Sequence, residues 1–118
     1  MARAGKTAIE PEVLEERIEE IEPPYDLVLL DDQEHTYDYV IEMLQKLFFQ
    51  SLDQAYQHAV EVDTMGRTVV ITCGRAEAEF GRDQILAYGP DWRMPNSKGS
   101  MTAIVEPSSQ GGSARTAG

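Results

Sequence analysis

The chain has 118 residues, a formal net charge of −11 and a single cysteine, Cys73. This length suits one domain with one small core, and the acidity argues against binding to nucleic acid or to an anionic membrane surface. A lone cysteine forms no internal disulfide, no apolar run approaches membrane-spanning length, and the charged N-terminal stretch lacks a signal-peptide pattern. We therefore expect a cytoplasmic protein that binds no membrane.

Composition divides the chain into three segments. Residues 1–22 are rich in glutamate and poor in aromatics, which predicts a flexible acidic N-terminal extension that ends before two prolines. Residues 108–118 are rich in glycine and serine and are predicted to be a disordered tail. The folded domain is therefore expected at residues 23–107.

The first predicted elements are a short buried strand and an amphipathic helix, joined by an acidic turn. Residues 27–30 are an apolar run of strand length, and residues 31–35 interrupt it with charged and turn-forming groups. Thr36 suits a helix N-cap, because its hydroxyl can accept from a backbone N–H two or three residues later. The apolar residues that follow have helical spacing: Val40, Leu44, Leu47 and Phe48.

A second helix is predicted over residues 52–64. Ser51 and Gln54 have the spacing of a capping box, and Gly66 suits the left-handed residue that ends a helix. The residues expected on its inner face are Leu52, Ala55, Tyr56, Ala59 and Val62.

The rest of the domain is predicted as strand, helix, loop and strand. Residues 67–73 are rich in β-branched residues, residues 75–88 form a helix that Gly81 weakens, and residues 101–105 form a last strand. The third helix is expected to face the core with Ala76, Phe80, Ile85 and Tyr88. The order strand–helix–helix–strand–helix–strand predicts an α+β fold, with three helices packed against a small three-stranded antiparallel sheet.

Two motifs resemble the ClpS family. Residues 25–32 read Tyr-Asp-Leu-Val-Leu-Leu-Asp-Asp and residues 39–48 read Tyr-Val-Ile-Glu-Met-Leu-Gln-Lys-Leu-Phe, which is similar to the first strand, turn and helix of that family. ClpS proteins are adaptors, not enzymes. The resemblance implies an adaptor that binds the bulky hydrophobic N-terminal residue of a substrate protein (an N-degron) and delivers it to a Clp-type AAA+ ATPase and its protease, without a cofactor. It also implies that the N-terminal extension contacts the ATPase.

The resemblance further implies a binding site. Asp31, Asp32 and Asp63 stand where the family has Asn, Asp and His residues that hold the free amino group, and all three keep an acceptor there. His35 and Thr36 replace the family's Thr-Pro, so the hydroxyl role falls to one or the other. The residues expected to form the side-chain pocket are His35, Thr36, Tyr37, Val40, Ala59, Val62 and Met101.

Two alternatives remain open. Asp31, Asp32 and Asp63, together with His35, are also a possible metal-binding or hydrolytic site, although their spacing matches no named metal motif and no nucleophile–base pair lies beside them. The second alternative is an interaction module with the ClpS fold that does not bind N-degrons. Without the family match, Asp31 and Asp32 would be read as ordinary turn and cap residues.

Overall fold

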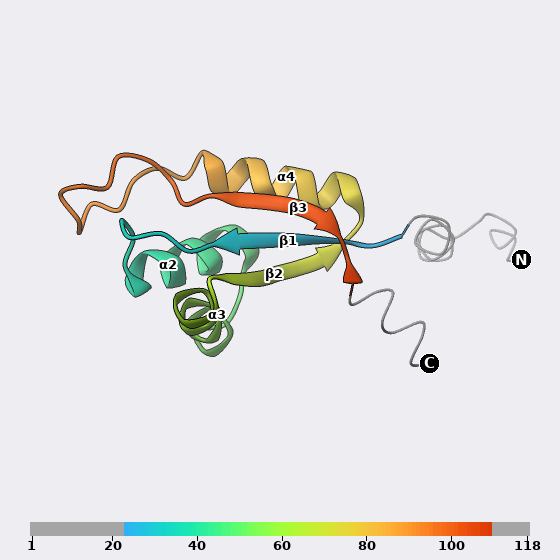
Figure 1. Ribbon diagram of the computed structural model, residues 1–118, viewed down its shortest axis with the longest axis horizontal. Coiled ribbons are helices and arrows are strands. Elements are labelled where there is room, and N and C mark those ends of the chain that lie inside the picture. The colour runs from blue at the N-terminus through green and yellow to red at the C-terminus, as the bar shows by residue number, and fades with distance from the viewer. Residues whose placement is uncertain (1–22, 110–118) are drawn as a thin grey trace, which may run out of the picture.

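The computed structural model describes residues 23–109 as an α+β fold (Figure 1). The predictions for residues 1–22 and 110–118 lie outside the described residues. The elements are β1 (Tyr25–Leu30), α2 (Tyr37–Phe48), α3 (Leu52–Met65), β2 (Arg67–Cys73), α4 (Arg75–Leu86) and β3 (Ala103–Pro107). Residues 23–109 contain three helices and a three-stranded antiparallel sheet, so the predicted fold class and element order are confirmed. Within residues 23–109, no helix has the length and apolar character needed to cross a membrane.

The predicted buried strand is the centre of the sheet. The strand order is β2-β1-β3, and β1 pairs antiparallel with both neighbours. Leu27, Val28 and Leu29 have no exposed surface, and Leu27 and Leu29 belong to the core that the helices cover. Since β1 is held on both sides, the acidic turn after Leu30 starts from a fixed point.

Helix α2 begins and ends as its sequence indicates. The Thr36 hydroxyl accepts from the Tyr39 backbone N–H, and Phe49 closes the helix in the left-handed conformation, with a φ of 56°. The helix buries Tyr39, Val40, Met43 and Leu44, whereas Leu47 and Phe48 pack only partly against the core. The first two turns of α2 therefore pack against the core.

Helix α3 is capped as predicted but faces the core differently. Ser51 and Gln54 form the capping box, and Gly66 ends the helix with a φ of 88°. The prediction of an inward Leu52 and Tyr56 is wrong, because their exposed fractions are 60% and 51%. The buried row is Ala55, Ala59 and Val62, whose small side chains let α3 lie close to α2 and β2.

Helix α4, like α3, packs against the core through small residues. Its buried residues are Ala78, Gly81 and Ile85, whereas Phe80, which was predicted to face inward, is 63% exposed. The inward prediction for Ala76 is also wrong, since it is exposed. A Cβ placed on Gly81 would lie 2.8 Å from Cδ2 of Leu27, so the missing side chain is what lets α4 approach the sheet.

Candidate functional site

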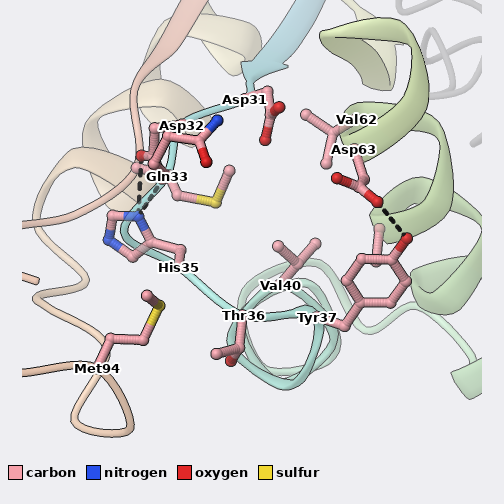
Figure 2. Close-up of a pocket in the computed structure, with 12 residues that line it drawn as sticks. Asp31, Asp32, Gln33, His35, Thr36, Tyr37, Val40, Val62, Asp63 and Met94 are labelled. Atoms are coloured by element: carbon pink, nitrogen blue, oxygen red, sulfur yellow. Dashed lines mark hydrogen bonds and ion pairs between the residues drawn. The ribbon is translucent and has the colours of Figure 1, made fainter.

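The acidic turn, the start of α2 and the end of α3 surround one pocket (Figure 2). It has a volume of about 160 Å³. All ten residues that the sequence analysis assigned to a site line it: Asp31, Asp32, His35, Thr36, Tyr37, Val40, Ala59, Val62, Asp63 and Met101. Gln33 and Met94 also line it, and the sequence analysis did not foresee either.

The floor of the pocket is apolar and belongs to the core. Val40, Ala59, Val62 and Met101 are each at most 3% exposed. Met101 lies just before β3, since that strand starts at Ala103 and not at the predicted residue 101. Because these side chains pack against the rest of the core, the floor of the pocket has a fixed shape.

Two carboxylates, Asp31 and Asp63, lie at the exposed rim (Figure 2). The backbone N–H of Asp31 donates to the Gly66 carbonyl at 3.0 Å, which ties the acidic turn to the end of α3. Within residues 23–109, the Asp31 carboxylate has no hydrogen bond or ion pair. Asp63 accepts a 2.6 Å hydrogen bond from the Tyr37 hydroxyl, and this bond raises the pKa of Tyr37. One rim carboxylate is therefore unpaired, and the other is engaged by a neutral donor.

The third carboxylate, Asp32, is held by His35. His35 Nδ1 lies 2.8 Å from both oxygens of Asp32, and Nε2 lies 2.7 Å from the Gly99 carbonyl oxygen. Both ring nitrogens thus lie within hydrogen-bond distance of oxygen atoms, on opposite sides of the ring. The His35 side chain is only 2% exposed, and its ring packs on Tyr39 at a centroid distance of 4.4 Å. His35 therefore fixes the position of the Asp32 carboxylate.

Thr36 has a structural role at the pocket wall. Its hydroxyl accepts from the Tyr39 N–H and donates to Oδ2 of Asp91 at 2.8 Å, while its backbone N–H donates to the same oxygen at 2.7 Å. Both His35 and Thr36 line the pocket, as predicted, and which of them takes the hydroxyl role in binding stays a prediction. Neither offers an unengaged polar group in this structure.

Asp91 is the most important residue that the sequence analysis missed. It is 1% exposed, and it accepts from Thr36 and from both the backbone and the guanidinium of Arg93. Burial raises the pKa of Asp91, but the hydrogen bonds from Thr36 and Arg93 outweigh it and lower the pKa to about 2. The Asp–x–Arg spacing in the loop hints at the local bonds, but nothing in the sequence points to Thr36, which is 55 positions away.

The metal alternative gains no support from this geometry. The part of the chain that the structure describes contains no group of three or more His, Cys, Asp or Glu residues placed to hold a metal ion. His35 directs both ring nitrogens at oxygen acceptors, so neither nitrogen is turned towards the pocket as a ligand.

Comparison with known proteins gives a consistent result. The family described as ATP-dependent Clp protease adaptor protein ClpS matches residues 20–93, which is more than half of the chain. The fold is similar to the structure of Agrobacterium tumefaciens ClpS2 bound to L-phenylalaninamide, with a TM-score of 0.63 and 22% sequence identity over 73% of this chain and 98% of that one. At this identity the structural match shows a shared fold, and the family match shows membership. The chain belongs to the ClpS family of ATP-dependent Clp protease adaptors.

Proposed function

We propose that the pocket binds the free N-terminal residue of a protein and that this adaptor delivers such proteins to a Clp AAA+ ATPase and its protease. The observation that supports it is the meeting of three carboxylates, Asp31, Asp32 and Asp63, with an apolar floor in one pocket. An α-ammonium group has three N–H donors and no acceptor, so it matches a rim of carboxylate oxygens. A large apolar side chain on the same residue matches the floor.

The size of the pocket supports a bulky first residue. The volume is about 160 Å³, and an apolar cavity of about 150 Å³ is large enough to bind benzene. A side chain of this size would contact Val40, Val62 and Met101. The related ClpS2 structure contains L-phenylalaninamide, which carries a free amino group and a phenyl side chain, as the proposed ligand does.

The charges around the pocket support a cationic group. His35 contacts both oxygens of Asp32, whereas the carboxylates of Asp31 and Asp63 at the rim have no cationic partner among residues 23–109. An ammonium between them would gain charge-assisted hydrogen bonds and lower the repulsion between them. The Tyr37 hydroxyl already donates to Asp63, so the ligand shares or displaces that bond.

The remaining parts of the proposal concern the whole chain. Residues 23–107 act as the adaptor domain, and residues 1–22, which lie outside the described residues, contact the ATPase. The adaptor works in the cytoplasm without a cofactor and without catalysing a reaction.

Peptide binding tests the proposal. Short labelled peptides that differ only in the first residue (Phe, Tyr, Trp, Leu, Ile, Val, Arg, Gly) are titrated by fluorescence anisotropy, each with an N-acetylated control. We expect binding of some bulky apolar first residues, lost on acetylation. Asp31→Ala should weaken it by roughly tenfold or more, because a charged acceptor is removed. Asp53→Ala, at an exposed acid on α3 outside the pocket, is the matched control and should bind normally.

Two outcomes would overturn the proposal. Absence of binding to every peptide would show that the replacement of the family's Asn and His by Asp31 and Asp63 has removed the activity. Equal binding of free and acetylated peptides would instead favour an interaction module. If free peptides bind, degradation of a reporter with the preferred first residue by a Clp ATPase–protease, with and without the adaptor, tests delivery.

A further inference from the structure

We infer that Met94 is a specificity-determining residue of this pocket, which selects the size of the first side chain of the bound protein. The inference rests on the proposed function. Met94 lines the pocket from the loop between α4 and β3, and it directly follows residues 20–93, which the family description matches. The family match therefore does not cover Met94, and its role follows from the structure of this chain.

The loop that carries Met94 is anchored on helix α2. The buried Asp91 accepts from the backbone and hydroxyl of Thr36, the N-cap of that helix. Arg93 pairs with Glu42 of α2 at 3.0 Å and with Asp91 at 3.1 Å. Asp91 and Arg93 thus tie the loop to α2 within three residues of Met94. The same helix supplies Tyr37 on the other side of the pocket.

The loop is also held after Met94. The Gly99 carbonyl accepts from His35 Nε2 at 2.7 Å, and the Ser97 hydroxyl accepts from the Asp91 N–H at 2.8 Å. The loop is therefore held on both sides of Met94.

The backbone of Met94 is fixed while its side chain can adapt. Its N–H donates to the Asp91 carbonyl, and its own carbonyl accepts from the Ser97 N–H, each at 3.1 Å. The side chain is unbranched and only partly buried, so it can adopt several rotamers against a ligand. Met94 can therefore contact first side chains of different size by changing its rotamer, while its backbone stays in place.

The arrangement of the walls places Met94 where the ligand's side chain would meet it. Figure 2 shows Met94 at the edge of the pocket across from Tyr37 and Asp63. The floor residues Val40 and Met101 are buried against the core and cannot retreat. A longer or wider side chain would therefore be accommodated at Met94 and not at the floor.

The test measures the ranking of peptides, not binding to one peptide. Met94→Ala enlarges the pocket at one wall, so the ratio of affinities for Trp-first over Leu-first peptides should rise by roughly tenfold, as expected when several methylene-sized contacts change in an apolar pocket. Met94→Phe should shift the ratio in the opposite direction. Met65→Ala is the matched control, because Met65 is 72% exposed and does not line the pocket.

The outcomes separate this inference from the proposed function. Opposite shifts in the ratio for the two Met94 variants, with no shift for Met65→Ala, support the inference. Unchanged ranking, or an equal loss for all peptides, would overturn it while leaving N-terminal binding intact. A wild-type protein that binds none of the peptides would refute the proposed function, and the inference would fail with it. Thermal unfolding of each variant checks that the loop change has not unfolded the domain.

Discussion

Replacing Asp91 should destabilise the domain more than replacing any exposed acid. The carboxylate is 1% exposed and accepts four hydrogen bonds, two from Thr36 and two from Arg93. Asp91→Ala leaves the Thr36 N–H at the start of α2 and the Arg93 guanidinium without this acceptor. Removing one partner of a buried charged group costs about 3–5 kcal/mol, and Arg93 keeps Glu42 as a partner, so we expect about 3 kcal/mol.

Asp91→Asn isolates the contribution of the charge. The amide keeps the shape of the side chain and one acceptor oxygen but places N–H donors opposite other donors. The pKa of Asp91 is lowered from 3.8 to about 2, which corresponds to about 2 kcal/mol of folding free energy at neutral pH. Asp91→Asn should therefore lose about 2 kcal/mol at pH 7, less than Asp91→Ala.

The sign of the pH dependence follows from the same shift. Because the folded-state pKa of Asp91 is below the unfolded one, the stabilisation is complete above pH 3.8 and is lost as the pH falls towards 2. Urea unfolding at several pH values should show a constant difference between wild type and Asp91→Asn at neutral pH. The difference should narrow below about pH 4.

A matched control is Asp83→Ala, whose carboxylate is 66% exposed and pairs only with the neighbouring Arg82. That change should alter the free energy of unfolding by about 0.5 kcal/mol or less. An Asp91→Ala protein that is as stable as Asp83→Ala would refute the reasoning. So would a stability difference between wild type and Asp91→Asn that does not change between pH 7 and pH 2.

Three further predictions follow from single contacts. Tyr37→Phe removes the hydroxyl that occupies Asp63, so binding of a Phe-first peptide should tighten by roughly fivefold, equivalent to about 1 kcal/mol; a large loss would mean that the hydroxyl contacts the ligand. Gly81→Ala places a Cβ 2.8 Å from Leu27, which has no exposed surface, so overpacking should outweigh the gain in helix propensity and lower the unfolding free energy in urea by about 1 kcal/mol. A stabilised variant would show that α4 can move. Burial raises the pKa of Cys73 to about 11, so iodoacetamide at pH 8, followed by mass spectrometry, should modify it about a hundredfold more slowly than in the unfolded chain; equal rates would contradict the burial.

The elements could be predicted from the sequence where their signals are local. The capping box of Ser51 and Gln54 and the glycine at position 66 lie within a few residues of the helix ends they define. Strand β2 matches its predicted bounds because its β-branched run lies between two glycines. Such signals need no tertiary contact.

The members of the pocket were identified mainly through the family resemblance. All ten predicted residues line it because the acidic turn and the ends of α2 and α3 converge there. Their roles in amine and side-chain binding stay predictions. Helical periodicity was a poorer guide to burial, since Phe80 is exposed and Gly81 is buried. Periodicity says which residues share a face, but close packing between elements decides which face turns inward.

What the sequence determined by itself is the order of the elements, their caps and the acidic character of the turn after β1. The tertiary structure alone decided how the carboxylates of Asp32 and Asp63 are held and which loop residue lines the pocket. His35 reaches Gly99 across 64 positions, and Thr36 reaches Asp91 across 55. These contacts bring Met94 to the pocket. They depend on the path of a loop over α2, and a long-range contact of this kind leaves no periodic or local pattern in the chain.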